Sequence, residues 1–234
     1  MTKEKEKRNF NRRYANEYHW GRTLFYNIFL RTVVDPVFYM FYNFEIHGKE
    51  NIPKDAGHYI YAANHVSVFD PPIVSFVIRK PIAYMAKAEL FEDSEKCRWI
   101  IKRLGAFAVN REKPELATFK TVKDIFKTKW SLGVFPQGGT FPYGKLENVK
   151  SGVAVISKHA KADIVPIAIS EFSGYPKTKT GGWKRQSFKA YIGKPISHEL
   201  SEDEILKRWS EFICSHADYE NCIEFEQQKT HVAV

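Results

Sequence analysis

Short apolar runs alternate with amphipathic helical patterns along most of this 234-residue chain. The runs predict strands at 58–63, 82–86, 106–110, 132–135, 164–169 and 188–192. Apolar residues at spacings of three and four predict helices at 95–104, 114–130 and 152–160 and a last helix beginning at Ser201. Such alternation is typical of an α/β fold with a mainly parallel sheet flanked by helices. Folds of this kind place their functional residues in loops beyond the carboxyl ends of the strands.

The first 44 residues do not follow this alternation. Residues 1–16 form a basic tail, residues 17–44 are predicted to be helical, and residues 45–234 form the α/β domain. The helical segment is rich in aromatic side chains, but charges and the Asp35-Pro36 pair interrupt it, so it is a poor bilayer-spanning helix and is expected to bend or break near that pair. Two interpretations stay open: a membrane-associating segment in the bilayer interface, and a helix packed on the domain's own core.

The net charge of +9 constrains the partners. A basic surface attracts polyanions, which include nucleic acid and anionic membrane. The sequence has no helix-turn-helix, RNP or zinc-finger signature, so nucleic acid is not expected and an anionic membrane surface is favoured. The three cysteines fit neither a disulfide framework nor a zinc site, and no metal-ligand spacing is present. A reduced, cytoplasmic setting and no metal are therefore expected.

An Asn64-His65 pair ends the first apolar run of the domain, and Asp70 follows five residues later, directly before two prolines. A short turn can fold Asp70 back onto His65. An aspartate bonded to one imidazole nitrogen fixes the tautomer and leaves the other nitrogen as a base, and an unperturbed imidazole titrates at about pH 6.5. The alternative is a capping aspartate beside an ordinary loop histidine, which this spacing alone favours.

A second polar turn follows the run at 132–135. Its residues are Pro136, Gln137, Gly138, Gly139 and Thr140. Backbone N–H groups in such a turn can cradle a phosphate or a developing oxyanion. The alternative is a simple glycine-rich turn.

Together the two turns resemble the glycerolipid acyltransferase family, whose best-known members acylate 1-acylglycerol-3-phosphate. An HxxxxD pattern at a strand end is followed about seventy residues later by FPxGG. Further blocks agree in order: AKAELF at 86–91, GAFAVNR at 105–111, IVPIAI at 164–169 and IGKPI at 192–196. The resemblance covers roughly residues 45–200, and several ordered blocks are more specific than any one of them.

The resemblance implies roles for individual residues. His65 would take the proton from the acceptor hydroxyl, and Asp70 would orient His65. Lys87 and Arg111 match family positions that bind the phosphate of the acceptor. The turn at Gly138–Thr140 would face that phosphate or the acyl carbonyl.

The implied reaction moves a fatty acyl group from acyl-CoA or acyl-carrier protein to the free hydroxyl of the lysophospholipid 1-acyl-sn-glycerol-3-phosphate, forming phosphatidic acid. No cofactor is expected. The family needs no covalent acyl-enzyme, and the sequence contains neither a GxSxG elbow nor an SxxK motif. The expected location is the cytoplasmic face of the membrane, as a peripheral or monotopic protein.

The third block departs from the family pattern, because FPEGTR is replaced by FPQGGT. Gln137 is a neutral amide in place of a carboxylate, although it still hydrogen-bonds. Asn64, Pro136 and Gln137 are expected to support the site. The departure leaves two alternatives: an acyltransferase for a different lysolipid or hydroxylated lipid, and a non-catalytic membrane-surface protein of the same fold.

Overall fold

The computed structural model describes residues 12–55, 58–92, 94–109, 116–146, 149–176, 181–217 and 219–221. Its strands are β1 (Tyr42–His47), β2 (Tyr59–Ala63), β3 (Ile82–Lys87), β4 (Phe107–Val109), β5 (Ser131–Val134), β6 (Gly144–Lys145), β7 (Asp163–Ser170), β8 (Gln186–Ile192) and β9 (Tyr219–Asn221). Its α-helices are α2 (Trp20–Phe29), α3 (Asp35–Phe41), α4 (Asp70–Ile78), α5 (Glu95–Arg103), α6 (Leu116–Ile125), α7 (Gly152–Ala160) and α8 (Glu202–His216). Short 3-10 turns lie at Ala15–Tyr18, Lys49–Asn51 and Ala88–Phe91, and a π-helical turn lies at Leu30–Val34.

Seven strands form the main sheet in the order β1-β8-β7-β2-β5-β3-β4. The described pairings in it are parallel, except that β7 and β8 are antiparallel. The six predicted strands are present as β2, β3, β4, β5, β7 and β8. The predicted α/β fold with a mainly parallel sheet is therefore confirmed.

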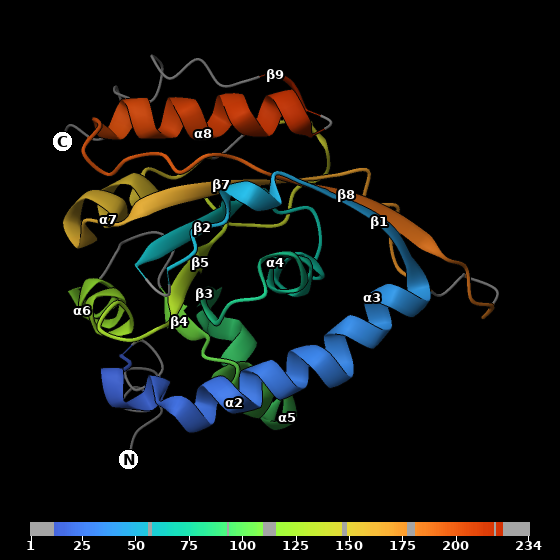
Figure 1. Ribbon diagram of the computed structural model, residues 1–234, viewed down its shortest axis with the longest axis horizontal. Helices are drawn as coiled ribbons and strands as arrows, with labels where there is room; N and C mark the ends of the chain where they lie inside the picture. The colour runs from blue at the N-terminus through green and yellow to red at the C-terminus, as the bar shows by residue number, and fades with distance from the viewer. Residues whose placement is uncertain are drawn as a thin grey trace.

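Helices cover both faces of the sheet (Figure 1). On one side α6, α7 and α8 contact one another in sequence, and α8 packs on β7. On the other side α4 lies between the sheet and the N-terminal helix, which crosses it as α2, the π-helical turn and α3. The N-terminal segment thus forms an extra layer over α4.

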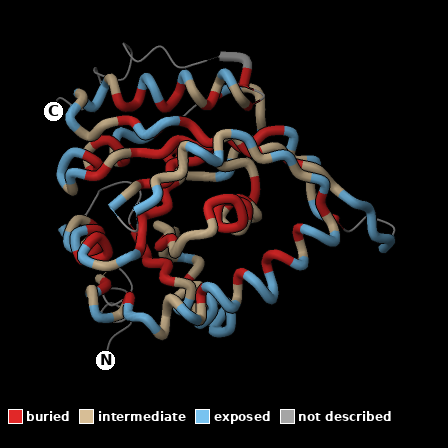
Figure 2. Tube along the Cα trace, in the orientation of Figure 1, coloured by how far each residue is buried: buried red, intermediate tan, exposed pale blue. Residues whose placement is uncertain are grey.

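The core lies along the central strands and α4, while the outer side of the N-terminal helix is exposed (Figure 2). Trp130 and Trp209 are fully buried, and the Trp209 indole donates to the carbonyl of Ala62 at 3.0 Å.

Gly105 follows α5 and has a φ of +88°, and a Cβ there would lie 2.5 Å from the Trp130 ring. Glycine is therefore required where α5 turns into β4.

The N-terminal helix differs from the prediction for residues 17–44. The regular helix is interrupted at Leu30–Val34, directly before the Asp35-Pro36 pair near which a bend or break was predicted, and Pro36 lies in the first turn of α3. In the π-helical turn the Asp35 N–H donates to the carbonyl of Leu30, so the missing N–H of Pro36 falls where the helical hydrogen-bond register is already shifted. Residues 42–44 are not helical, because they belong to β1 and pair in parallel with β8.

Other differences are local. Residues 114 and 115 of the helix predicted at 114–130 lie outside the described residues, and the helix ends at Ile125, whose carbonyl accepts the Thr128 N–H at 2.9 Å and the Thr128 hydroxyl at 2.6 Å in a turn. Cys214 is disulfide-bonded, so the expectation that the cysteines are reduced is wrong for this residue.

Within the described ranges, no helix combines the length and apolarity needed to cross a membrane. The proposed domain boundaries at 16 and 44 stay predictions.

Candidate active site

The predicted polar turns meet at one edge of the sheet. His65 follows the end of β2, and the Pro136–Thr140 turn follows the end of β5. These two strands are hydrogen-bonded neighbours and run in parallel, so the loops beyond them lie side by side. Lys87 is the last residue of β3, which pairs with β5 from its other side.

His65 and Asp70 are in direct contact, as the sequence predicted. The imidazole Nδ1 lies 2.7 Å from Asp70 Oδ2. The same carboxylate oxygen accepts the backbone N–H groups of Val66 at 2.7 Å and Ser67 at 2.8 Å. With the carboxylate ionised, Nδ1–H donates to it, and Nε2 is left to accept a proton.

Asp70 is fully buried at the first turn of α4. Burial raises the pKa of its carboxyl group, while the hydrogen bonds from His65 and from the Ser67 and Val66 N–H groups oppose that rise. Its second oxygen, Oδ1, is buried with no hydrogen-bond partner among the described residues. The carboxylate is thus held in a low-dielectric position where its interaction with the imidazole is strong.

The His65 side chain is held by packing as well as by Asp70. Its ring stacks on Phe135 with centroids 4.2 Å apart and planes 23° apart. The side chain is 12% exposed. The imidazole is therefore fixed in orientation but remains reachable from the adjoining cavities.

Two buried amides fix the backbone around His65. Gln137 is 1% exposed, and its Oε1 accepts the His65 N–H at 2.8 Å. Asn64 accepts from the Ile169 N–H at 2.7 Å and donates to the Ile169 carbonyl at 2.9 Å, which ties the end of β2 to the end of β7. The supporting role expected for these residues stays a prediction, and these contacts are the ones through which they would exert it. The amide oxygen of Gln137 makes a contact that a carboxylate oxygen could equally make, so the departure from FPEGTR preserves an acceptor for the His65 N–H.

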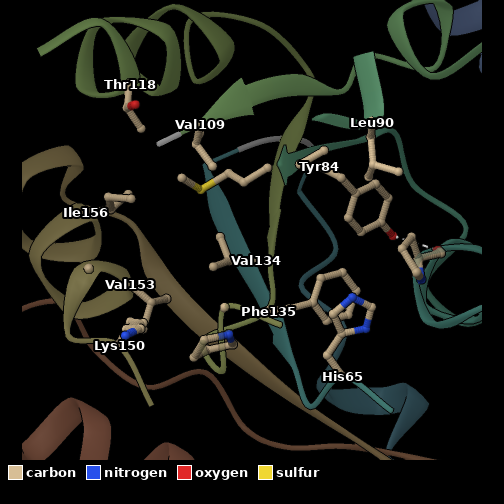
Figure 3. A pocket seen from close by; sticks show the side chains of 16 residues that line it. His65, Tyr84, Leu90, Val109, Thr118, Val134, Phe135, Lys150, Val153 and Ile156 are labelled. Carbon is tan, nitrogen blue, oxygen red and sulfur yellow. Dashed lines mark hydrogen bonds between the residues drawn. The ribbon is translucent and has the colours of Figure 1, made fainter. Parts of the chain in front are cut away.

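A cavity of about 170 Å³ opens beside His65 (Figure 3). Its wall is mostly apolar, and it runs from Phe135 and His65 past Val134 toward α6 and α7. Lys150 and Gly138 border it near the turn. Lys150 directly precedes the α7 cap Ser151, and its N–H donates to the Pro136 carbonyl at 2.8 Å.

A second cavity of about 370 Å³ meets the first one at His65. It lies beneath the N-terminal helix, and its lining is almost entirely apolar. Leu30 and Val34 of the π-helical turn contribute to this lining. The two cavities share His65, Pro71, Tyr84, Ala86 and Leu90. His65 therefore lies at the junction of two mainly apolar spaces.

The predicted phosphate-binding residues are only partly brought together. Gly138, with a φ of +67°, lines the smaller cavity, whereas Gly139 and the exposed Thr140 do not line either cavity among the described residues. Lys87 is exposed at the same edge of the sheet, paired in register with Val109. Arg111 lies outside the described residues.

Two residues of this region were missed by the sequence reasoning. Lys150 is a cation at the mouth of the smaller cavity, and its position just before a helix was the only signal for it. Tyr84 lines both cavities, and its hydroxyl lies 2.9 Å from Ser75 Oγ and donates to the Pro71 carbonyl at 3.0 Å. No pattern around Tyr84 distinguished it from an ordinary strand residue.

The arrangement suits proton transfer at the head of a lipid. It offers a histidine with a buried carboxylate partner, one lysine (Lys150) at the rim of the smaller cavity, and two apolar spaces. Within the part of the chain that the structure describes, no group of three or more histidine, cysteine or acidic side chains is placed to hold a metal ion.

Residues 43–170 match the Acyltransferase protein family. The chain is 32% identical over 178 residues to the 1-acyl-sn-glycerol-3-phosphate acyltransferase of Streptococcus pneumoniae, covering 75% of this chain and 64% of that protein. It is 32% identical over 158 residues to the Bacillus subtilis protein of the same name, covering 65% and 73% of the two chains.

A solved structure has a similar fold. It is the crystal structure of the 1-acyl-sn-glycerophosphate acyltransferase PlsC from Thermotoga maritima, with a TM-score of 0.61 and 24% identity over 80% of this chain and 75% of that one. The matched family region contains the His65–Asp70 pair, the Gln137 turn and both neighbouring strands. The chain therefore belongs to the Acyltransferase family.

Proposed function

We propose that the chain transfers a fatty acyl group from acyl-CoA or acyl-carrier protein to the free hydroxyl of 1-acyl-sn-glycerol-3-phosphate, forming phosphatidic acid for phospholipid biosynthesis. The observation that carries this proposal is the His65–Asp70 pair at the junction of two apolar cavities. Relatives in Streptococcus pneumoniae and Bacillus subtilis bear the name of this activity.

The proposed chemistry is a direct transfer. His65 Nε2 removes the proton of the acceptor hydroxyl as its oxygen attacks the thioester carbonyl, and Asp70 stabilises the imidazolium that forms. A carbon–oxygen bond then replaces the carbon–sulfur bond, and the imidazolium returns the proton to the departing thiolate. The products are the ester and a free thiol, so no group stays on the enzyme.

The cavities fit two substrates that each carry an acyl chain. One chain belongs to the thioester and the other to the lysophospholipid, and both must reach the imidazole with their reacting ends. Burial in apolar space favours long chains at about 0.8 kcal/mol per CH₂ group. Two apolar cavities that meet at His65 match this requirement.

The acceptor phosphate is assigned to the rim of the smaller cavity. Lys150 and Gly138 border the cavity there, and Gly152 at the start of α7 lines it as well. A lysine beside a helix start attracts an anion. Lys87 at the end of β3 and Arg111 are proposed to contribute further charge.

The proposed location is the cytoplasmic face of the membrane, in peripheral contact. Trp20, Leu24 and Ile28 recur every four residues on the exposed side of α2, where they are 79%, 50% and 51% exposed. An exposed apolar stripe of this kind is typical of helices that lie in the bilayer interface. The soluble acyl donors would reach the enzyme from the cytoplasm.

A panel of acceptors tests the proposal. Oleoyl-CoA and oleoyl-acyl-carrier protein would each be incubated with the full chain and lysophosphatidic acid, lysophosphatidylglycerol, lysophosphatidylcholine or monoacylglycerol, with thiol release and labelled product followed together. We expect phosphatidic acid from lysophosphatidic acid with at least one donor, and little thiol release without acceptor. A preference for another lysolipid would replace the acceptor assignment. Failure of the whole panel would favour a non-catalytic protein of this fold.

A further inference from the structure

A second polar site lies away from His65, between α2 and α5. It is a shallow groove of about 420 Å³ lined by Arg22, Glu95, Arg98, Trp99, Lys102 and Arg103. Among the described residues, it shares no lining residue with the two cavities at His65. The groove is therefore separate from the proposed acyl-transfer site.

Positive charge is concentrated in this groove. Four of its six lining residues are cations, and one is a carboxylate. Burial lowers the pKa of Lys102, and repulsion from Arg13, Arg98 and Arg22 lowers it further. An anion in the groove would relieve this mutual repulsion.

The arginines are held in place by the protein. Arg22 Nη1 donates to the Lys102 carbonyl at 3.1 Å, which ties α2 to the last turn of α5. The Arg103 guanidinium lies 5.2 Å from the centre of the Phe25 ring. Arg98 donates to Glu95 at 3.2 Å. Ordered guanidinium groups lose less conformational entropy when they bind a phosphate.

Large apolar side chains border the groove on the surface. Trp99 is 58% exposed and packs edge-on against Phe25, with ring centroids 6.0 Å apart. Ile100 next to it is 37% exposed. The exposed apolar stripe of α2, which begins at Trp20, lies on the neighbouring helix, because α2 contacts α5. Tryptophan and basic residues side by side are typical of the headgroup boundary of a bilayer.

We propose that this groove binds the phosphate of an anionic phospholipid at the bilayer surface, with Trp20 and Trp99 at the level of the headgroups. The proposal rests on the membrane location given above and names the lipid contact that produces it. A bilayer supplies both the negative charge that the groove attracts and the apolar layer that would cover the exposed side chains. A soluble phosphate or an acidic protein surface supplies only the charge.

The position of α5 connects this contact with the acyl-transfer site. Ile101 of α5 and Leu104 just beyond it line the larger apolar cavity, while Arg98 and Trp99 line the groove. A phospholipid held on the outside of α5 would keep that cavity next to the membrane. The groove thus affects the affinity of the protein for the lipid surface and not the rate of the chemical step at His65.

Vesicle binding tests the proposal without relying on activity. The variant Arg98→Gln/Arg103→Gln removes two charges from the groove. The matched control Lys207→Gln/Arg208→Gln removes two exposed charges from α8, on the opposite side of the molecule from α2 and α5 (Figure 1). Co-sedimentation would use vesicles of phosphatidylcholine alone, and of phosphatidylcholine with 30 mol% phosphatidylglycerol, over a salt series.

We expect the groove variant to lose about 30-fold in affinity for the anionic vesicles, the effect of two cations near such a surface. The control should lose less than threefold, and added salt should weaken wild-type binding. Equal losses in both variants would show a response to net charge alone and overturn the proposal, as would wild-type affinity in the groove variant. Unchanged thermal unfolding of each variant would show that the fold is intact.

Two further arms separate the sources of negative charge. Inorganic phosphate at constant ionic strength should leave vesicle binding within twofold, and displacement by millimolar phosphate would assign the groove to a soluble anion instead. The groove variant should keep its acyl-transfer rate and its KM for acyl-CoA and acyl-carrier protein in detergent micelles. A raised KM for either donor with normal vesicle binding would assign the groove to the donor. Since vesicle binding is measured without substrate, it can succeed or fail independently of the proposed reaction.

Discussion

Replacing Asp70 with asparagine separates catalysis from stability, because the two should move in opposite directions. The asparagine has nearly the same shape, and its oxygen can still accept the N–H groups of Val66 and Ser67 that now lie 2.7 and 2.8 Å from Asp70 Oδ2. What changes is the charge beside the His65 Nδ1, at 2.7 Å. The local backbone is therefore expected to survive the substitution.

The loss of activity can be bounded from these contacts. A hydrogen bond to a charged group contributes about 1.5–3 kcal/mol, which corresponds to about 10–150-fold in rate for the His65–Asp70 bond alone. Loss of the charge that faces the imidazolium adds to this, up to the roughly 10⁴-fold effect of the same change in a serine protease triad. We expect kcat to fall by about 10²–10⁴-fold.

The stability effect follows from the raised pKa of Asp70. Burial raises that pKa above the ordinary value of 3.8, so the unfolded chain releases this proton at a lower pH than the folded one. The contribution of Asp70 to stability is present below pH 3.8 and is lost as the pH rises through the folded-state pKa. Asparagine does not titrate, so the melting temperature of Asp70→Asn relative to wild type should increase from acid toward neutral pH.

Thermal unfolding between pH 4 and pH 7 and initial rates at pH 7 measure the two effects. For a chain of this size, each 1 kcal/mol shifts the melting temperature by about 2–4 °C. Near-wild-type kcat in Asp70→Asn would refute the role given to the carboxylate. A melting temperature that falls further below wild type as the pH rises would refute the assignment of Asp70 as a destabilised buried charge.

Three further substitutions probe the walls of the site. Gln137→Glu keeps an oxygen that can accept the His65 N–H but adds a buried ionisable group, so the melting temperature should fall, and an unchanged melting temperature would contradict this. Gly133→Ala places a Cβ 2.4 Å from the Tyr84 ring and should cost about 1–3 kcal/mol in unfolding free energy, whereas an unchanged melting temperature would show that the ring moves freely. Ala86→Leu narrows both cavities, so kcat/KM over a series of acyl-CoA lengths should shift toward shorter chains, by about fourfold for each CH₂ group excluded, and an unchanged preference would remove the cavities from chain binding.

The alternation of strands and helices was readable because each element carries its own pattern. Strand β1, which the sequence did not predict, shows the limit of that local information. Its residues 42–47 form a strand because they pair in parallel with β8, a partner about 140 positions away. Parallel pairing between distant segments leaves little local pattern, so residues 42–44 are predicted as the end of the preceding helix and residues 45–47 are not predicted as a strand. The π-helical turn at Leu30–Val34 likewise depends on packing over α4.

In the site, too, local contacts were predictable from the sequence and contacts between distant segments were not. The contact between His65 and Asp70 was predictable because a short turn can bring residues five positions apart together, but the spacing alone did not give their roles, which came from the resemblance to a family. Gln137 was noticed only as a departure from a motif, since the N–H that it accepts lies 72 positions earlier in the chain. Lys150 and the cavities arise from the packing of several distant elements, and no spacing in the sequence encodes a space between them.

The most direct test of the general-base assignment compares two histidines that make the same kind of contact. His198 Nδ1 lies 2.7 Å from Asp163 Oδ1 at the start of β7, the end of that strand opposite to the His65 site. Labelled phosphatidic acid formed from oleoyl-CoA and lysophosphatidic acid in detergent micelles would be measured for His65→Ala and His198→Ala. We predict a loss of about 10²–10⁴-fold for His65→Ala and less than threefold for His198→Ala. Comparable rates for the two variants, with both folded, would contradict the assignment of His65 as the base.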